Sequence, residues 1–217
     1  MKKTNKIERQ FRKEIVYTNR ICVENSLIRS SDGNISIRLD TDRFLITPSG
    51  LYKRRLKRGQ ILIVNSKGEL IHGKGDLKPS SERLMHMEAY RQREDIGALL
   101  HAHPPYSTAL TLAGIPFPEN IVPEILALLG EVATAHYAVP GTQDLAKSIS
   151  EPIKTHDAIL LSNHGSLTVG RTLEQALIAL ERMEFAAHLY YLANNLGKII
   201  PLPEAEIKRL RDLQAGK

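Results

Sequence analysis

Three histidines and one glutamate are the residues of this chain whose types and spacing could support chemistry. His101 and His103 stand two apart in LLHAHPPYS, His164 lies in LLSNHGS, and Glu82 ends KPSSE. Three imidazoles that leave one position open are typical of a catalytic Zn²⁺ site. A carboxylate beside such an ion can act as a general base. The set predicts metal-assisted carbanion chemistry on a small phosphorylated molecule.

The spacing of the histidines predicts that they lie at strand ends. The apolar run Ile96 to His103 is expected to be a buried strand, which a Pro-Pro pair then ends. Residues two apart in a strand point to one face, so His101 and His103 could chelate one ion. From this spacing alone, two partly exposed histidines are an equally good interpretation. His164 favours the metal, because it too follows an apolar run and precedes a glycine.

Three short segments, SDGN, TPSG and PSSE, could hold a phosphate group. Their polar and flexible residues are Gly33, Asn34, Ser49, Gly50, Ser80 and Ser81. The serines of PSSE precede a predicted helix, whose free N–H groups and dipole favour an anion. Each segment alone is more often an ordinary turn or helix cap. The prediction therefore depends on all three segments meeting near the histidines.

Glu82 is predicted to lie in the first turn of the helix that follows PSSE. A glutamate there is favoured by the helix dipole, so a structural role is one interpretation. The chemical interpretation is a general base. Removing a proton from carbon next to a carbonyl is difficult, and a Lewis-acid ion on the carbonyl and hydroxyl oxygens eases it through an enediolate. The carboxylate then only has to move the proton.

Composition and length narrow the class of protein. The 217 residues contain no linker or repeat, so one domain over residues 1–217 is expected. No apolar run approaches the ~20 residues of a membrane span, and the charged N-terminus does not resemble a signal peptide. The single cysteine, Cys22, is expected in the core and excludes an internal disulfide, which is compatible with a reducing cytoplasm.

The net charge of +6 is compatible with a nucleic acid or an anionic metabolite. The densest basic run, KRRLKR over 53–58, is interpreted as a solvated loop surface. Aromatic residues are scarce and no recognition-helix pattern is present, so nucleic acid is not an expected partner.

The apolar periodicity predicts an α/β fold. Helices are expected over 5–27, 82–93, 106–113, 123–129, from Thr142 onward, and over 172–197. Strands are expected within 31–39 and 43–50, and over 61–64, 69–72, 96–103, 132–136, 157–163 and 166–170. Ser80 or Ser81 is expected to cap the second helix. Hairpins in one part of the chain and intervening helices in another predict a mixed or antiparallel sheet with helices on its faces.

Five motifs in order, SDGNISIR, LITPSG, KPSSE, HAHPPYS and LLSNHG, resemble the class II aldolase/adducin-like family, and within it the aldolases of L-fuculose 1-phosphate. The motifs extend over about residues 31–170, and the flanking helices agree. The resemblance implies a single three-layer α/β/α domain with a mainly antiparallel central sheet. It also implies a homotetramer with active sites near subunit interfaces, while the composition predicts a cytoplasmic protein.

Carried over by position, the resemblance implies one Zn²⁺ per subunit, or another divalent ion, held by His101, His103 and His164. Glu82 matches the acid/base residue, which can also ligate the metal. Gly33, Asn34, Ser49, Gly50, Ser80 and Ser81 match the loops that hold the substrate phosphate. The implied reaction is reversible cleavage of a ketose 1-phosphate, such as L-fuculose 1-phosphate, into dihydroxyacetone phosphate and a short aldehyde. The expected partner is thus a small sugar phosphate, not a membrane or a nucleic acid.

Departures from the family pattern lie on the aldehyde side. The L-fuculose 1-phosphate aldolases have a tyrosine in the stretch equivalent to PEILALLGEV and another in the C-terminal tail, whereas the last tyrosine here is Tyr191. Ser49 replaces a threonine but keeps the hydroxyl, and related pentulose-phosphate 4-epimerases carry aspartate where Glu82 stands. A methylthioribulose-1-phosphate dehydratase, a sugar-acid phosphate decarboxylase and a non-enzymatic adducin-like protein are the alternatives. His86, one turn after Glu82, could lie behind the site.

Overall fold

The computed structural model describes the backbone of residues 2–215 and the side chains of residues 6–212. Its strands are β1 (Asn34–Arg38), β2 (Phe44–Ile46), β3 (Leu62–Val64), β4 (Leu70–His72), β5 (Ala98–Ala102), β6 (Val132–Ala135), β7 (Ala158–Leu161) and β8 (Gly165–Gly170). Its α-helices are α1 (Lys2–Glu24), α2 (Arg83–Gln92), α3 (Pro105–Leu112), α4 (Pro123–Leu128), α5 (Gln143–Ile149), α6 (Leu173–Leu196) and α7 (Glu204–Ala215). Three short 3₁₀ helices are η1 (Lys53–Arg55), η2 (Arg58–Gln60) and η3 (Pro152–Lys154).

The eight strands form one sheet in the order β4-β3-β2-β1-β5-β8-β7-β6. Every neighbouring pair is antiparallel except β6 and β7, which are parallel. The four N-terminal strands follow one another across one half of the sheet, and the connection from β2 to β3 contains η1 and η2. The other half needs crossovers, and β5 lies in the centre next to both β1 and β8.

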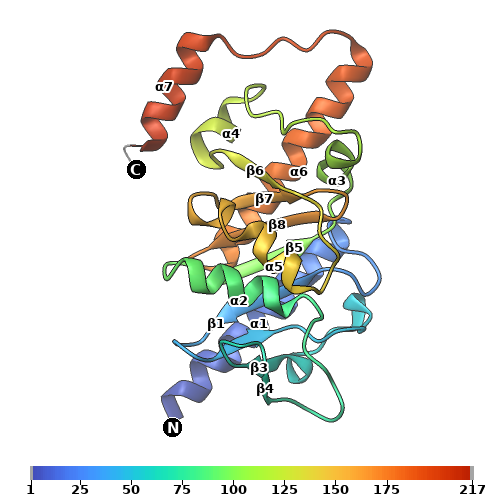
Figure 1. Ribbon diagram of the computed structural model, residues 1–217, viewed down its shortest axis with the longest axis vertical. Helices are drawn as coiled ribbons and strands as arrows, with labels where there is room; N and C mark the ends of the chain where they lie inside the picture. Colours follow the sequence, from blue (N-terminus) through green and yellow to red (C-terminus); the bar gives the residue numbers. More distant parts are fainter. Residues whose placement is uncertain (1, 216–217) are drawn as a thin grey trace.

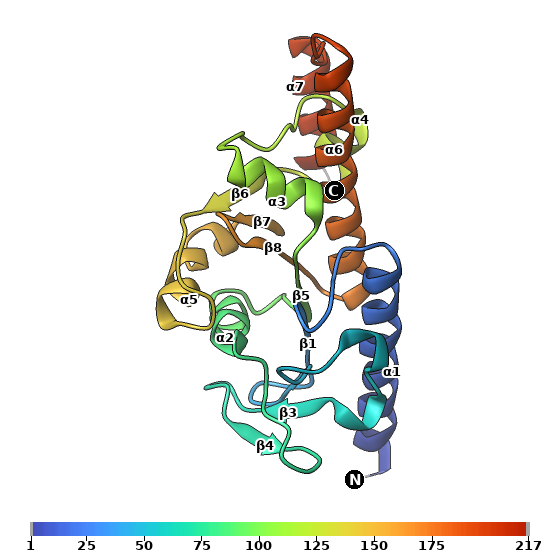
Figure 2. The same ribbon diagram turned by 90° about the vertical axis from the view of Figure 1, so that its right-hand side faces the viewer.

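Helices cover both faces of the sheet (Figure 1), and the layers separate clearly in the side view of Figure 2. Helices α1 and α6 lie on one face, and α2 and α5 lie on the other. A separate set of buried apolar side chains fills the space between the sheet and each helical layer. The predicted three-layer α/β/α domain with a mainly antiparallel sheet is confirmed.

Burial on both faces explains the apolar runs that predicted the central strands. All five residues of β5 are buried, including His101, and so are all four of β7. A strand covered on both faces is apolar without alternation, which is why these segments are continuous runs. Cys22 is fully buried in the α1 layer, as predicted.

Helix α7 follows α6 and lies against α4 at one end of the molecule. The N–H of Leu202 donates to the carbonyl of Asn120, and Arg211 pairs with Glu119, so this segment is fastened to the α4 region. The sequence patterns did not predict α7. Within the described residues, no helix has both the length and the apolar character needed to cross a membrane.

Two local predictions were wrong. Neither Ser80 nor Ser81 caps α2; Glu82 is the N-cap residue, and the Ser80 hydroxyl accepts a hydrogen bond from the Glu82 N–H. The run KRRLKR is only partly a solvated surface, because Lys53 is 2 % exposed. Thr142 does cap α5, as predicted, and accepts from the N–H of Leu145.

Candidate active site

The register of the central strands brings the predicted site residues together. Asn34 of β1 pairs with His101 of β5, and His101 pairs in turn with Leu167 of β8. Side chains that are directly opposite on neighbouring strands share one face of the sheet. Asn34 and His101 are therefore neighbours on the face covered by α2, although 67 residues separate them in the chain.

His103 and His164 reach the same point from just outside the strands. His103 lies one residue beyond β5, and its N–H donates to the carbonyl of Leu27. His164 follows Asn163, whose φ of 55° turns the chain between β7 and β8. At Gly165 an added Cβ would lie 2.4 Å from the Ala102 carbonyl oxygen and 2.7 Å from the His103 ring, so only glycine lets β8 approach this closely.

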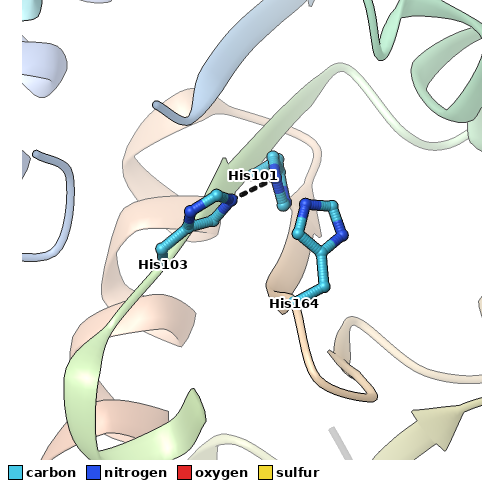
Figure 3. Close-up of side chains that lie close together, drawn as sticks. All are labelled: His101, His103 and His164. Carbon is cyan, nitrogen blue, oxygen red and sulfur yellow. Dashed lines mark hydrogen bonds between the residues drawn. The ribbon is translucent and has the colours of Figure 1, made fainter. Parts of the chain in front are cut away.

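The three imidazoles converge (Figure 3), with one potential ligand atom from each inside a span of 4.8 Å. The ring centroids of His101 and His103 are 4.8 Å apart, and those of His103 and His164 are 4.9 Å apart. Glu82 adjoins the group from α2: its Oε2 lies 3.0 Å from His101 Nε2, and its Oε1 lies 3.1 Å from His164 Nε2. The predicted spatial grouping is thus present.

Hydrogen bonds around His101 show that this arrangement suits a cation. Its Nδ1 is 2.8 Å from the Ser166 carbonyl oxygen, which can only accept, so Nδ1 carries the proton. In a neutral ring, Nε2 is then an acceptor, and it faces His103 Nε2 at 3.0 Å as well as the Glu82 carboxylate. Several acceptors pointing at one another are stabilised only by a proton or a metal ion between them.

An unpartnered oxygen at the same point supports this interpretation. Glu82 Oε1 is buried and has no hydrogen-bond partner among the described residues. The approach of Glu82 Oε1 to His164 Nε2 is close but lacks the geometry of a hydrogen bond. The residues present therefore fit a divalent metal ion, with three histidine ligands and a carboxylate beside them.

The protonation states also suit ligation. Burial, together with the neighbouring His101 and His164, lowers the pKa of His103 to about 3, so this ring is neutral at neutral pH. Burial alone would raise the pKa of the Glu82 carboxyl, but positive charge at His101, aided by His164 and Asn34, holds it well below its usual range, and a metal ion in that place would act in the same direction. A metal binds the deprotonated forms of both groups.

The three predicted phosphate segments border this group. A backbone bridge between Pro48 and Pro79 joins TPSG to PSSE, while SDGN leads directly into β1. Gly33 has φ of 70°, and an added Cβ would lie 2.9 Å from the His101 carbonyl oxygen. Some donors of the segments are already used: the Ser49 N–H donates to the Lys78 carbonyl, and the Asn34 amide donates to Glu82 Oε2. Ser49, Gly50 and Ser81 are exposed and Ser80 is buried.

Comparisons with known proteins decide the family. The profile described as "Class II Aldolase and Adducin N-terminal domain" matches residues 13–191. This chain belongs to the class II aldolase and adducin family. It is similar to L-fuculose 1-phosphate aldolase in a solved structure at a TM-score of 0.83, with 32% identity over 93% of this chain and 94% of that one.

Among curated relatives, the chain is 37% identical to the 5-deoxy-D-ribulose 1-phosphate aldolase of Bacillus thuringiensis serovar kurstaki, over 92% of each. It is 33% identical to the 5-methylthioribulose-1-phosphate/5-deoxyribulose-1-phosphate aldolase of Rhodospirillum rubrum, over 85% of this chain and 81% of that protein. It is also 32% identical to a 3-oxo-tetronate 4-phosphate decarboxylase of Haemophilus influenzae, over 83% and 86%. The chain is thus a lyase of the aldolase type. Class II aldolases depend on a metal ion, and the three histidines form a group that could hold one.

Behind the class II aldolase site, a chain of buried polar groups ends at Glu82. The Asn34 amide donates to Glu82 Oε2, so its oxygen faces the other way and accepts from His86 Nε2. Because burial lowers the pKa of His86 to about 3, the ring is neutral, and its Nδ1 accepts from the Ser36 hydroxyl at 2.7 Å. Ser36 in turn accepts from the Tyr90 hydroxyl at 2.8 Å. Each group from Tyr90 to Asn34 therefore donates one hydrogen bond in the direction of Glu82, and each group between these two ends also accepts one.

The sequence patterns missed Ser36, Tyr90 and Lys53 in this region. Ser36 alternates with Ile35 and Ile37 on β1, so the only signal is a polar residue on the face that carries Asn34. His86 was considered, because it stands one helical turn after Glu82. Its place directly behind Asn34 supports that alternative.

Proposed function

We propose that this enzyme is a Zn²⁺-dependent class II aldolase that reversibly cleaves a deoxyketose 1-phosphate into dihydroxyacetone phosphate and a short aldehyde. The observation that carries the proposal is the carboxylate of Glu82, held within about 3 Å of two of the three converging histidines. The relatives named for 5-deoxyribulose 1-phosphate and the structure named for L-fuculose 1-phosphate support this class of substrate.

His101, His103 and His164 would hold the ion, and Glu82 would lie beside it. When bound, the metal supplies Lewis acidity to the carbonyl and hydroxyl oxygens of the sugar. In the condensation direction, Glu82 removes a proton from the carbon next to the carbonyl of dihydroxyacetone phosphate. In the cleavage direction, Glu82 returns that proton after the carbon–carbon bond has broken.

The hydrogen bonds to Glu82 suit it to this transfer. Asn34 fixes one carboxylate oxygen, and the unpartnered Oε1 is the oxygen left to take the proton. The backbone of Gly33 and Gly50 and the hydroxyls of Ser49, Ser80 and Ser81 would bind the substrate phosphate, with Asn34 at the edge of that site. The active unit would be a cytoplasmic homotetramer, as the sequence resemblance implies.

The test is a cleavage assay on zinc-loaded enzyme with 5-deoxyribulose, L-fuculose, L-rhamnulose, ribulose and methylthioribulose 1-phosphates. Release of dihydroxyacetone phosphate is the expected result, and the substrate with the highest kcat/KM identifies the aldehyde. Metal-loaded enzyme that releases none from any of them would refute the proposal.

A decarboxylase of a sugar-acid phosphate is the second candidate, supported by the relative with that name. The same residues would serve it, because loss of carbon dioxide from a 3-oxo acid also leaves a carbanion next to a carbonyl. Carbon dioxide released from a 3-oxo-tetronate 4-phosphate, without dihydroxyacetone phosphate release from the ketose phosphates, would favour this candidate over the aldolase.

A further inference from the structure

Lys53 is the one lysine or arginine that is buried among the described side chains, with 2 % exposed surface. It begins η1, three residues after the TPSG segment, within a basic run whose other charged residues are exposed. Lysine is almost never fully buried unless it is paired, because burial removes the water that stabilises the ammonium. A buried lysine at this place therefore requires an explanation.

The ammonium of Lys53 is poorly satisfied within the protein. Its Nζ donates to the Pro48 carbonyl oxygen at 3.5 Å, which is at the limit of a hydrogen bond. An ammonium has three donors, and among residues 6–212 no carboxylate forms an ion pair with this one. Two donors of the ammonium thus have no partner among the described residues.

The position of Lys53 relates it to all three phosphate segments. Its hydrogen-bond partner, Pro48, immediately precedes Ser49. The charges of Asp32, next to Gly33 in the chain, and of Glu82, next to Ser81, both raise the pKa of Lys53. The contact with Pro48 places the ammonium beside the TPSG segment.

The backbone of Lys53 is fixed from two sides. Its N–H donates to the carbonyl of Ser30 at 2.8 Å, and the buried amide of Asn19 donates to its carbonyl at 2.8 Å. Helix α1 and the loop before Gly33 thus both hold the residue in place. A cation held in advance loses little entropy when it binds an anion.

The segments themselves offer mainly neutral donors, which are hydroxyl and N–H groups. A phosphate monoester carries a charge of about −1.5 to −2 at pH 7. Placing that charge near the Glu82 carboxylate is more favourable when an ammonium, in addition to the metal ion, lies close by. We propose that Lys53 is a phosphate-binding residue, whose ammonium supplies the positive charge for the phosphate of the substrate between the three segments.

The chemistry of the group agrees with this role. Burial lowers the pKa of Lys53 to about 8, although Asp32 and Glu82 act in the opposite direction. The group is still mainly protonated at neutral pH, and a bound dianion would stabilise the protonated form further. The ligand class, a phosphate monoester, rests on the proposed function, but the presence of an anion site does not.

The test measures binding of inorganic phosphate to the zinc-loaded protein by titration calorimetry. Lys53→Met removes the charge and keeps an apolar stem, and Lys53→Gln is a second variant that retains a donor for Pro48. Arg54→Met is the matched control, because it removes an exposed charge from the neighbouring position. Both Lys53 variants should bind phosphate about tenfold more weakly or worse, as expected for loss of a charged hydrogen bond. Arg54→Met should bind within about twofold of the parent.

Two further measurements distinguish a loss of phosphate binding from a structural effect of the Lys53 substitutions. Zinc content and melting temperature of the Lys53 variants should match the parent, because removal of an unpaired buried charge is rarely destabilising. In the cleavage assay, KM for the ketose 1-phosphate should rise more than kcat falls. A fall confined to kcat would overturn the proposal in favour of another role for Lys53.

Parent-like phosphate affinity in both Lys53 variants would overturn the proposal, and so would a parent that binds no phosphate. A loss in Lys78→Met alone would also overturn it, because Lys78 lines a pocket together with Ser49 and Ser81 of the phosphate segments. These outcomes concern phosphate binding alone and do not depend on whether the enzyme cleaves a ketose 1-phosphate. If the parent binds phosphate through Lys53 but cleaves no ketose 1-phosphate, the proposed aldolase activity fails and the anion site remains.

Discussion

Glu82 and Glu88 lie at the start and in the middle of the same helical segment, and they are buried to nearly the same extent, with 7 % and 9 % exposed. Their surroundings differ completely. Glu88 accepts hydrogen bonds from Arg91, Gln92 and Ser150, so donors surround its carboxylate. Glu82 accepts one hydrogen bond, from Asn34, while its Oε2 also faces His101 Nε2, an acceptor in the neutral ring, and its Oε1 has no partner.

The difference separates a structural carboxylate from a reactive one. The donors around Glu88 neutralise its charge and connect α2 to α5, so that site is complete within the protein. The acceptors around Glu82 leave a deficit of positive charge, which a metal ion or a proton must supply. Burial alone therefore does not mark a functional acid; the character of its neighbours does.

Removal of the metal should have the largest effect on activity. It should change the surroundings of Glu82 and leave those of Glu88 as they are. Chelated enzyme is expected to lose its activity and to melt at a lower temperature, because metal binding stabilises the folded state. His103→Ala should lower both zinc content and turnover. His156→Ala, which changes a histidine bonded to Pro152 and Thr155 away from the site, should change neither. Full activity in metal-free enzyme would contradict a metal role for the three histidines.

Glu82→Gln tests the acid directly. Turnover should fall by roughly a hundredfold to ten-thousandfold, the range for loss of a general acid–base group. The three histidines should still bind zinc, which elemental analysis measures. Glu88→Gln is the matched control on the same helix and should retain turnover within about twofold. Equal losses in both variants would mean that α2 as a whole, and not Glu82, was disturbed.

The grouping of the three histidines was predictable because it depends on local periodicity. Two residues two apart in a strand share a face whatever the rest of the fold does. The turn that carries His164 follows an apolar run that is equally visible in the sequence. Their meeting point depends on β5 and β8 being neighbours, which the resemblance to a family implied and the pairing confirms.

Other features depend on contacts between distant segments and leave no local signal. Lys53 belongs to a basic run that is typical of an exposed loop, and its backbone is held by hydrogen bonds with Asn19 and Ser30, which are distant in the sequence. Helix α7 carries Ile207 and Leu210 at helical spacing, but that pattern does not indicate that the helix packs against α4, which lies far away in the sequence. The N-cap prediction was wrong because the Ser80 hydroxyl bonds to Glu82, whereas a cap would bond further into the helix.

Substitutions in the hydrogen-bonded series behind Glu82 should lower kcat by an intermediate amount, which decreases with distance from Glu82. His86→Leu removes the group that holds the Asn34 oxygen, so the amide can turn away from Glu82. We expect kcat to fall by roughly tenfold to a hundredfold, as for other groups that orient a metal site indirectly. KM and zinc content should stay near those of the parent. An unchanged kcat would show that Asn34 keeps its orientation without His86.

Tyr90→Phe is the matched variant at the far end of that chain. It removes only the donor to Ser36, which can still donate to His86. The expected cost is about 1 kcal/mol of unfolding free energy, typical of one lost hydrogen bond. Turnover should remain within about twofold. A kcat loss as large as that of His86→Leu would mean that the whole chain, and not the Asn34 contact, controls Glu82.

The smallest effect should come from the structural carboxylate. Burial raises the pKa of Glu88, but hydrogen bonds from Arg91, Gln92 and Ser150 outweigh it and lower the pKa to about 2. A carboxyl whose pKa is lower in the folded protein stabilises the fold at pH values above its pKa in the unfolded protein. This stabilisation is lost as the pH falls through its pKa in the folded protein. Glu88→Gln should therefore be less stable than the parent by about 1 kcal/mol at neutral pH, a figure that allows for the exposed side of Arg91.

Urea unfolding of the Glu88→Gln variant and the parent across this range measures the effect. The difference between the two proteins should shrink as the pH falls from about 5 to about 2, because the parent carboxyl becomes protonated there. A difference that stays constant with pH would assign the loss to packing, since only the ionised form of Glu88 attracts Arg91. Such a result would weaken the contrast between the two glutamates, because the neighbours of Glu88 would then stabilise its shape and not its charge.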